Sequence, residues 1–523
     1  MTHSQLRDHS FLGLTQSICP DCVRVVPAKI IARDGRVYFR KQCPEHGLRD
    51  DFVCSDERWF DRSGHSAPGR LPPTMGVAPE RGCPYDCGLC TEHEQHTCVA
   101  VLEITSSCNL TCPLCYAVSA PGGKHVPLDD CLRAIDRLVE CEGRPEILQL
   151  SGGEPTIHPQ FLEIFEYACS RPIDVVMINT NGIRLARDAA FRKAIARLKH
   201  RSEIYLQFDG FRDDANLALR GERLLDAKLR AIEALGEEGI RATLVCTLER
   251  ELNLDQVGRI IEFGLERPWI TGVCFQPATY VGRYPLPDEL ERRVTFPDVI
   301  RAISEQSSIW RETDFLPLPC AHPNSHTLAY AYRHEGRAVP LTRFLDVENN
   351  LDLLANGITF NRAAAQKLIG EFLSRSACGG DESCGCGPVL PTGGNTVPTG
   401  ANTFPTIEMP TIGGGALPML KADNFVKEAG DSFFRRALAQ DLSPADVFRI
   451  TITSFMDAFN FDIRALMKSC VHHLLPSGHL VPFCAYNLLY RDGRVPLPPL
   501  AGVPTVSGGG ASTRQPREVV EIS

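Results

Sequence analysis

The pattern of hydrophobic and polar positions between residues 101 and 280 alternates short apolar runs with longer amphipathic ones. Six runs rich in β-branched residues predict strands at 101–105, 146–153, 174–182, 203–210, 242–249 and 272–280. Between them, apolar residues recur every three or four positions, as in 129–140, 161–170, 187–198 and 223–239, which predicts helices. Strands that alternate with helices are typical of a parallel sheet. We therefore predict an α/β fold with a partial or complete parallel (β/α) barrel.

Different patterns flank this region. Upstream, two apolar runs meet at Arg33-Asp34-Gly35, which predicts a β-hairpin. Downstream, residues 424–440 and 443–468 show helical periodicity, and we expect these helices to cover the mouth of the barrel with their apolar faces in a core. Residues 387–418 are rich in Pro, Gly and Thr and predict an irregular loop.

Composition narrows the class of protein. The chain has 523 residues and a formal net charge of −9, so it lacks the basic surface expected of a nucleic-acid partner. It contains no run of 18 apolar residues, and its first residues lack the pattern of a secretory signal, so we expect a cytoplasmic protein. In that reducing compartment, 22 Cys point to metal ligation rather than disulfides.

The first cysteines surround the predicted hairpin. Cys19 and Cys22 form a Cys-x-x-Cys pair, Cys43 follows the second strand, and we expect Cys54 to be the fourth ligand, with His46 as the alternative. This segment resembles rubredoxin-like and zinc-ribbon modules. Thiolate ligands suit a single iron or zinc ion equally well.

Two further groups predict auxiliary clusters. Within 16 residues, Cys83, Cys87, Cys90 and Cys98 predict a fully ligated 4Fe-4S cluster, with a second zinc site as the alternative. A late pool of cysteines in Gly- and Pro-rich settings predicts one more cluster, and its members are Cys320, Cys378, Cys384, Cys386, Cys470 and Cys484. Five isolated cysteines in periodic segments are expected to be buried in the core: Cys131, Cys141, Cys169, Cys246 and Cys274.

The cysteines after the first predicted strand carry the catalytic signal. Cys108, Cys112 and Cys115 have the spacing C-x3-C-x2-C with no fourth cysteine nearby. Three thiolates on a 4Fe-4S cluster leave one iron open for a small molecule. The loop follows residues 101–105, so it lies at a strand's carboxyl end, where barrel enzymes place their chemistry.

These residues, with the run Gly152-Gly153-Glu154-Pro155, resemble the radical S-adenosylmethionine (SAM) superfamily over about residues 100 to 285. The resemblance implies that SAM binds the open iron, that the GGEP residues contact its methionine amino group and that Leu114, where most members have an aromatic residue, meets the adenine. Polar residues at the strand ends are candidates for cofactor contacts, namely Asn179, Asn181, Gln207, Asp209 and Gln276. Arg220 and Arg223 are candidates for binding a carboxylate.

Nearly the whole chain resembles one branch of that superfamily, which contains class D radical methylases described for a hydroxymethylpterin and the tetraether lipid synthases. The resemblance rests on CPDC…CPEHG, on GCPYDCGLC…HTC and on SFMDAFNFD…CVHH…VPFCAYN. Relatives carry PC-x-HP-x-CC where this chain has Cys320 followed by Ser325 and His326, so His326 is a candidate replacement ligand.

This organisation divides the chain at 75, 100, 290, 386, 418 and 496. The resulting segments are a rubredoxin-like metal module (1–75), an auxiliary-cluster segment (76–100), the radical SAM core (101–290), an auxiliary-cluster region (291–386), the loop 387–418, a helical cap (419–496) and a flexible tail (497–523).

Two reactions share hydrogen abstraction by a 5′-deoxyadenosyl radical as their first step. The number of clusters and the apolar cap favour carbon–carbon bond formation between lipid tails, with peripheral membrane contact. The alternative is methylation of a pterin-like heterocycle, for which a polar pocket rather than a hydrophobic channel is expected. Either reaction needs an electron donor such as a reductase or ferredoxin. A non-catalytic electron-transfer protein would not require the three-cysteine site.

Overall fold

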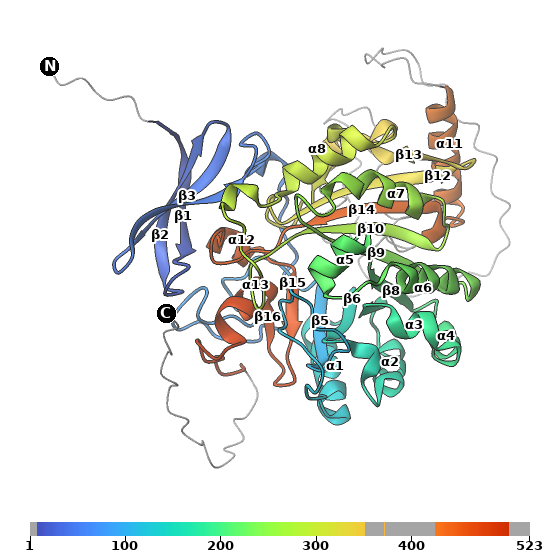
Figure 1. Cartoon of the computed structure of the whole chain (residues 1–523), viewed down its shortest axis with the longest axis horizontal. Helices are drawn as coiled ribbons and strands as arrows, with labels where there is room; N and C mark the ends of the chain where they lie inside the picture. The colour runs from blue at the N-terminus through green and yellow to red at the C-terminus, as the bar shows by residue number, and fades with distance from the viewer. Residues whose placement is uncertain (1–7, 351–370, 372–423, 502–523) are drawn as a thin grey trace, which may run out of the picture.

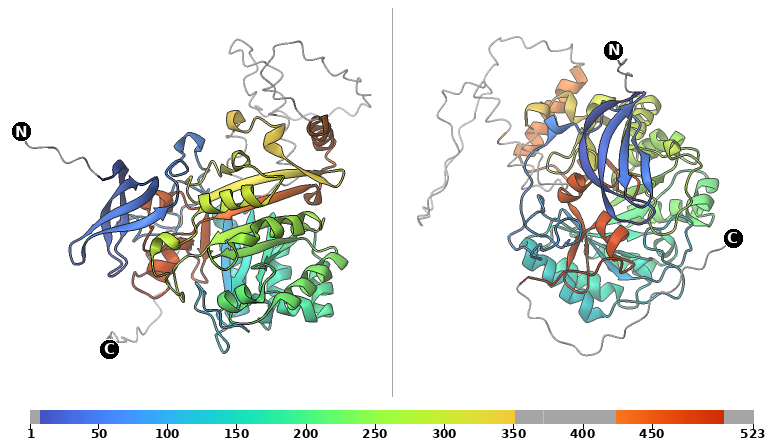
Figure 2. Two further views of the ribbon diagram at one scale, coloured as in Figure 1. Left: turned by 45° about the horizontal axis from the view of Figure 1, so that its top comes forward. Right: turned by 90° about the vertical axis from the view of Figure 1, so that its left-hand side faces the viewer.

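The computed structural model describes residues 8–350, 371 and 424–501. At the N-terminus, four antiparallel strands form a separate sheet in the order β1-β2-β3-β4. These strands are β1 (Ser10–Ile18), β2 (Val25–Arg33), β3 (Arg36–Cys43) and β4 (Gly47–Cys54). The predicted hairpin joins β2 to β3, and Asp34 and Gly35 in its two-residue turn have positive φ angles of 52° and 72°. In Figures 1 and 2 this ribbon lies beside the main body of the molecule.

The main body is the predicted parallel α/β sheet. Its first six strands are β5 (Val99–Thr105), β6 (Ile147–Gly152), β7 (Val175–Thr180), β8 (Ser202–Gln207), β9 (Ala242–Leu248) and β10 (Ile270–Pro277). The helices between them are α1 (Leu128–Glu142), α2 (Phe161–Ser170), α3 (Ile183–Arg187), α4 (Ala189–Ala196), α5 (Asp213–Arg220), α6 (Leu225–Glu237) and α7 (Val257–Leu265). The six predicted strands are all present and lie side by side in sequence order.

The helices cover the outer face of the curved sheet (Figures 1 and 2). Leu138 of α1, Phe165 of α2 and Leu235 of α6 are completely buried and belong to one core with the outward-facing Leu102 and Ile178. This core explains the 3.6-residue period of the helices, because only one stripe of each helix meets the sheet. The opposite, inner face of the sheet lines a cavity.

Later strands extend this sheet at both ends, beyond the expected limit at residue 290. β14 (Val447–Thr453) adds a parallel strand beside β10, and β15 (Val471–Leu474) adds one beside β5. The edges are antiparallel and consist of β11 (Leu316–Pro317), β12 (His326–His334), β13 (Arg337–Pro340) and β16 (Leu480–Pro482). The order is β11-β12-β14-β10-β9-β8-β7-β6-β5-β15-β16, which describes a partial barrel with two ends.

The prediction of helix over 443–468 is therefore wrong for its first half. Residues 447–453 have the sequence VFRITIT, whose β-branched residues favour a strand. Buried and partly buried positions alternate in the middle of this segment, as a strand requires. Only the short α12 (Ile463–Met467) is helical in the second half.

The other α-helices given for the described ranges are α8 (Phe296–Gln306), α11 (Asn424–Leu438) and α13 (Phe483–Ala485). The apolar face of α11 does form a core, as Phe433 is buried with Tyr332 of β12. It packs against the sheet edge and contributes no residue to the cavity wall described below, so the expectation that it covers the barrel mouth is wrong. No helix in the described ranges combines the length and apolarity needed to cross a bilayer.

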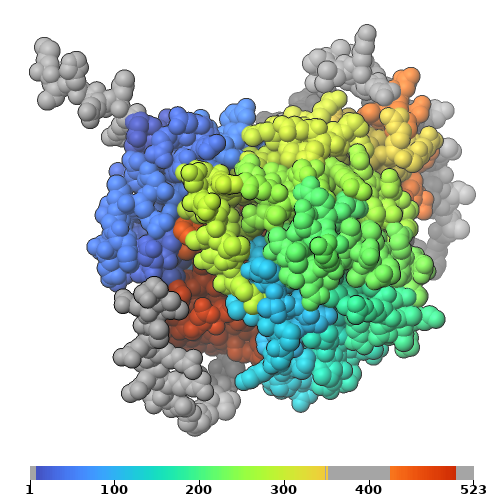
Figure 3. Space-filling view, viewed as in Figure 1, coloured from blue at the N-terminus to red at the C-terminus, as the bar shows by residue number. Residues whose placement is uncertain are grey.

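The ribbon is fixed to the C-terminal part of the chain, beside which it lies in Figure 3. The fully buried Lys41 of β3 donates hydrogen bonds to the carbonyl oxygens of Ala458 and Phe459 at 2.7 and 2.8 Å. Its ammonium group also pairs with Asp51 at 2.8 Å. A buried charge with this many acceptors holds the two segments in one geometry.

Candidate active site

The loop after β5 brings its three cysteines to one cavity. Cys108, Cys112 and Cys115 line a space of about 240 Å³ inside the partial barrel, together with Leu114. Arg283, which follows β10 in the chain, holds this loop. It donates hydrogen bonds to the carbonyl oxygens of Cys112, at 2.6 Å, and Ser119, at 2.9 Å. The spacing correctly predicted this convergence, because all three residues belong to a single short loop.

The thiols of this loop suit a cationic centre. Burial raises the pKa of Cys108 to about 12 and also raises the pKa of Cys112. Metal ligation requires thiolates, so an iron–sulfur cluster would supply the positive charge that these buried sulfurs need in order to ionise.

The two glycines of the GGEP run allow this segment to lie directly on the cysteine loop. The backbone N–H groups of Gly153 and Glu154 donate to the carbonyl oxygens of Thr105 and Ser107, at 2.8 and 2.9 Å. A Cβ added at Gly152 would lie 2.1 Å from the oxygen of Thr105, and one at Gly153 would lie 2.1 Å from that of Ser107. Pro155 begins the short turn that follows. The glycines therefore position the cluster loop.

Glu154 is buried at the edge of the cavity. Its Oε1 accepts hydrogen bonds from Thr156 N, Thr156 Oγ1 and Thr180 Oγ1, and its Oε2 accepts one from Asn181 N at 2.8 Å. Burial raises the pKa of this carboxyl group. Oε2 has accepting capacity left, which agrees with the expected contact to an ammonium group.

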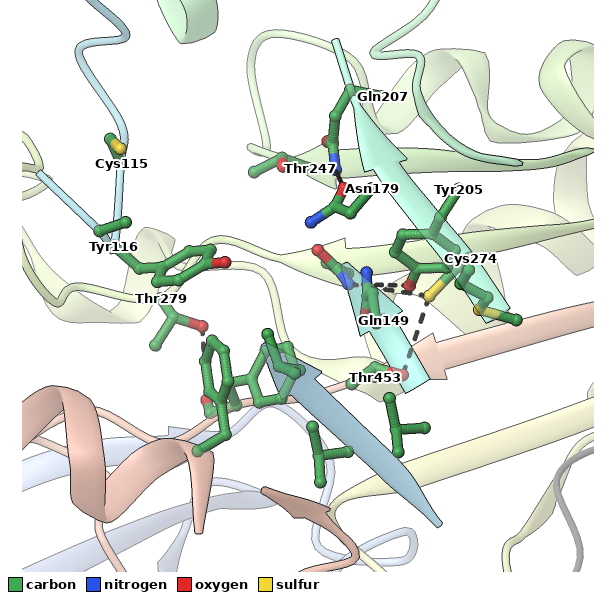
Figure 4. A pocket seen from close by; sticks show the side chains of 18 of the residues that line it. Cys115, Tyr116, Gln149, Asn179, Tyr205, Gln207, Thr247, Cys274, Thr279 and Thr453 are labelled. Carbon is green, nitrogen blue, oxygen red and sulfur yellow. Dashed lines mark hydrogen bonds between the residues drawn. The ribbon is translucent and has the colours of Figure 1, made fainter. Parts of the chain in front are cut away.

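Predicted polar residues form a connected chain along the cavity wall (Figure 4). Asn179 Nδ2 donates to Ser151 Oγ at 3.0 Å, and Gln207 Nε2 donates to Asn179 Oδ1 at 3.1 Å. Arg220 then donates to Gln207 Oε1 at 3.1 Å and to Thr247 Oγ1 at 2.9 Å. Asn181 also lines the cavity.

Asp209 lies behind this wall. It receives two hydrogen bonds of 2.7 Å from Arg220 and contributes nothing to the cavity lining. Burial alone would raise its pKa, but Arg220 and Lys228 outweigh burial and hold the pKa below the usual value. Asp209 is therefore a positioning residue for Arg220 and no cofactor ligand. Arg223, the other arginine considered, is exposed.

Deeper in the barrel, the cavity has polar groups that the sequence reasoning missed. Cys274, which we expected in the core, faces the cavity and lies 3.8 Å from Thr453 Oγ1. The predicted Gln276 donates to Tyr205 Oη at 3.1 Å. Gln149 lines the same space. The alternation of side chains along a strand could have identified these residues. Because successive side chains point to opposite faces, residues 149, 205 and 274 lie on the same face of the sheet as residues 151, 207 and 276.

The other isolated cysteines match their prediction. Cys131, Cys141, Cys169 and Cys246 are all buried among apolar side chains of the main core. They carry no sign of ligation in the described part of the structure.

The N-terminal ribbon contains a metal site with His46 as its fourth member. The ligand atoms of Cys19, Cys22, Cys43 and His46 all lie within 4.8 Å of one another. Cys22 and Cys43 have their sulfurs 3.8 Å apart, and His46 Nδ1 lies 3.5 Å from Cys43 Sγ. Tetrahedral Zn–S bonds of about 2.3 Å place sulfurs about 3.8 Å apart, so the geometry fits a mononuclear ion.

The prediction that Cys54 is the fourth ligand is wrong. In the β3–β4 pair, Cys54 lies opposite Val37 while Cys43 lies opposite Gly47. Six residues of strand separate the two positions, which corresponds to roughly 20 Å. Cys54 is instead buried in the main core, and its thiol lies 3.5 Å from the carbonyl oxygen of Asp56.

The second predicted cluster group is divided by the fold. Cys83, Cys87 and Cys90 line one small pocket with Glu92 and His93. The Cys83 thiol and burial together raise the pKa of Cys87, as expected where thiols crowd together. Cys98 lies elsewhere, in contact with Cys320 and Cys470 of the late pool. The expected set of four is therefore wrong in its last member.

The late pool contributes two of its members to this contact. Cys484 is not one of them: the thiols in contact with Cys98 are those of Cys320 and Cys470, whereas the Cys484 sulfur accepts a hydrogen bond from Met456 N at 3.2 Å. Cys378, Cys384 and Cys386 lie outside the described residues.

Known proteins share both parts of this architecture. Residues 11–55 match the HMPTM N-terminal zinc ribbon domain, and residues 102–264 match the radical SAM superfamily. A 7,8-dihydro-6-hydroxymethylpterin dimethyltransferase from Methanocaldococcus jannaschii is 31% identical over 510 residues, covering 91% of this chain and 94% of that protein.

More distant matches concern the core alone. Mycofactocin maturase MftC from Mycobacterium tuberculosis is 30% identical over 159 residues, which are 29% of this chain and 39% of that protein. Among solved structures, Streptococcus suis SuiB is similar with a TM-score of 0.35 and 18% identity, covering 40% of this chain and 46% of that one. The three-cysteine loop, the GGEP segment and the match along nearly the whole length agree: the chain belongs to the radical SAM superfamily and, within it, to the family of the hydroxymethylpterin dimethyltransferase.

Proposed function

We propose that this radical SAM enzyme methylates a pterin-like heterocycle bound in the barrel cavity. The cavity supports this substrate class because its wall carries the carboxamides of Gln149, Asn179, Gln207 and Gln276. A carboxamide both donates and accepts hydrogen bonds, which matches the alternating donors and acceptors on the edge of a pterin ring. The dimethyltransferase similarity points to the same class.

Gln149 is the observation that carries the proposal. Its side chain lies in the middle of the cavity in Figure 4, on the strand next to β5. Among the described residues, its carboxamide has no hydrogen-bond partner although the residue is only 8% exposed. The polar atoms of Gln149 face the cavity rather than packed protein, so they are free to hydrogen-bond to a bound molecule.

The catalytic cofactors belong to the cysteine loop. Cys108, Cys112 and Cys115 would hold the 4Fe-4S cluster, which with bound SAM and an external reductant would supply the 5′-deoxyadenosyl radical. On the proposed reaction, a carbon from a methylene donor would replace a ring hydrogen, and the external reductant and solvent would supply the two electrons and two protons that convert it to a methyl group. Arg220, fixed by Asp209, offers a cation at the cavity wall for a carboxylate.

Coupling of lipid tails is the reaction that the number of clusters and the apolar cap favoured. It requires a long hydrophobic channel, whereas four carboxamides interrupt the otherwise largely apolar wall of this cavity and α11 lies away from it. A volume of about 240 Å³ suits a compact ring more than two extended alkyl chains.

The test is an anaerobic assay of the reconstituted enzyme with SAM, dithionite and either 7,8-dihydro-6-hydroxymethylpterin or a membrane diether lipid. Mass spectrometry should show a pterin heavier by one or two methyl groups, together with 5′-deoxyadenosine. Supplying isotope-labelled SAM and labelled methylene donors in separate reactions identifies the source of the added carbon.

Two variants sharpen the assay. Gln149→Ala should raise the KM for the pterin by roughly tenfold, since one hydrogen bond of about 1 kcal/mol and the surrounding packing are lost. Gln160 lies at the N-terminus of the outer helix α2, so Gln160→Ala should leave the KM for the pterin unchanged. A coupled lipid product without any methylated pterin would overturn the proposal.

A further inference from the structure

Three cysteines from distant parts of the chain meet where the two ends of the partial barrel approach each other. Cys98 immediately precedes β5, Cys470 immediately precedes β15, and Cys320 lies in the turn between β11 and β12. We call this place the seam. The backbone N–H of Cys98 donates to the Cys470 carbonyl oxygen at 2.9 Å, and the Cys98 thiol contacts the thiols of Cys320 and Cys470.

His326 completes the group. It is the first residue of β12 and pairs with Thr453 at the carboxyl end of β14. Its Nδ1 lies 3.2 Å from Thr453 Oγ1, and its ring is in hydrogen-bonding contact with the Cys470 thiol. The residue is 8% exposed and also lines the barrel cavity.

We propose that His326 is the fourth ligand of an iron–sulfur cluster held at the seam by Cys98, Cys320 and Cys470. The hydroxyl of Thr453 fixes the ring through Nδ1 and leaves Nε2 for iron, an arrangement usual for metal-bound histidines. Histidine replaces cysteine on iron in known clusters, so the donor set is chemically suitable.

Two kinds of metal centre suit the donors at the seam. Three cysteines and one histidine also suit zinc, which would hold all four ligand atoms about 3.8 Å or less apart. Within the described ranges, the ribbon site is the group whose ligand atoms all lie within 4.8 Å of one another, and the seam residues do not meet that limit. The seam is therefore looser than the ribbon site, although the Cys98 thiol contacts two other thiols, and metal analysis of Cys320→Ala distinguishes zinc from an iron–sulfur cluster.

His96 is the competing histidine, and its contacts give it a different role. Its Nδ1 lies 2.8 Å from Gln95 Oε1, and its Nε2 lies 3.6 Å from the Glu146 carboxylate and 3.7 Å from Cys98 Sγ. Both nitrogens thus face acceptors, as expected of a ring that donates hydrogen bonds to the site rather than binding iron.

This ligation has a consequence for electron flow. A neutral imidazole in place of a thiolate makes the cluster less negative and raises its reduction potential. Because His326 also lines the cavity, the seam cluster is a suitable electron acceptor close to the substrate. This role is independent of whether the substrate is a pterin.

The test is pulsed EPR of the full-length, cluster-reconstituted and dithionite-reduced enzyme without substrate or SAM. Protein labelled with ¹⁵N-histidine should show an altered nitrogen hyperfine coupling. His326→Cys should retain its iron and sulfide, lose one directly bonded nitrogen coupling and have a lower midpoint potential at one cluster. His96→Ala should retain the coupling.

Three outcomes would overturn the assignment. The first is an identical nitrogen coupling in His326→Cys and the wild type. The second is loss of that coupling in His96→Ala. The third is zinc that is lost with Cys320→Ala while the iron content stays the same. Methylation of a pterin is not measured, so failure here leaves the proposed function untouched.

Discussion

At the scale of single residues, the cluster loop depends on two glycines. The GGEP segment lies so close to the loop that an added Cβ at either glycine would overlap a backbone oxygen. Backbone atoms cannot move aside as a flexible side chain can, so any larger residue must displace the loop that carries the cysteines.

We predict that Gly153→Ala loses SAM cleavage. Overpacking of this kind costs about 1–3 kcal/mol, equivalent to a drop of roughly fivefold to 150-fold in 5′-deoxyadenosine formation. Gly64→Ala is the matched control, because a Cβ there meets no atom within 4 Å. Full activity in Gly153→Ala with normal iron content would contradict the packing argument.

Residue identities were predictable where partners are close in sequence. Cys108, Cys112 and Cys115 share one loop, so their spacing alone indicated a common ligand. Cys54 and Cys98 were assigned to their nearest groups, and both assignments are wrong because strand direction carries each one away. The spacing of residues along the sequence does not show how far apart they lie in the folded protein, because tertiary packing decides that distance.

At the scale of secondary-structure elements, α6 is attached to the active-site wall through Lys228. Its Nζ donates to the carbonyl oxygen of Gln207 at the end of β8, at 2.5 Å, and the side chain is 1% exposed. Burial lowers the pKa of Lys228 to about 8, although Asp209 opposes that shift. In the unfolded chain the pKa is roughly 10.4.

Because of Lys228, the free energy of unfolding of the enzyme should rise with pH between the pKa values of this lysine in the folded and unfolded states. Below about pH 8 both states bind the proton, and the folded state bears the full cost of the buried charge. As pH rises toward 10.4 the folded state is already neutral, and the cost diminishes. Between about pH 7.5 and pH 9.5, the wild type should gain about 2 kcal/mol relative to Lys228→Met.

Thermal melting of the two proteins across this pH range checks the prediction. Lys199→Met serves as the control, because Lys199 is an exposed lysine that also donates to a carbonyl oxygen, that of Glu238. It should melt in parallel with the wild type. A constant difference between the wild type and Lys228→Met would mean that Lys228 titrates normally.

Elements were predictable where strand and helix alternate regularly. All six strands were expected, as were helices α1, α2, α4 and α6, because each of these helices buries one apolar stripe and each strand is a short buried run, whereas α3, α5 and α7 were not named. The strand at 447–453 was taken for helix, since its apolar residues continue into a segment with helical periodicity. Its place beside β10 depends on pairing across more than 150 residues, which periodicity does not encode.

At the scale of the whole molecule, the seam joins segments far apart in the chain. Cys98 and Cys320 are roughly 220 residues apart, and Cys470 follows roughly 150 residues later. A cluster bound to all three would restrict the unfolded chain much as a cross-link does. The entropy of closing a loop of this length corresponds to roughly 5 kcal/mol.

Cluster loading should consequently stabilise the entire fold, and the increment should depend on the seam. We predict that reconstitution raises the melting temperature of the metal-free wild type by about 5 °C or more. Cys320→Ser should lose most of that gain. Cys22→Ser, which removes a ligand from the ribbon, should keep it, because the ribbon site joins residues within one hairpin region. Differential scanning fluorimetry under anaerobic conditions measures all three, with iron analysis to establish loading. An equal gain in Cys320→Ser and the wild type would mean that the seam does not link the two ends of the barrel, since a bound cluster must stabilise the folded state that forms its site.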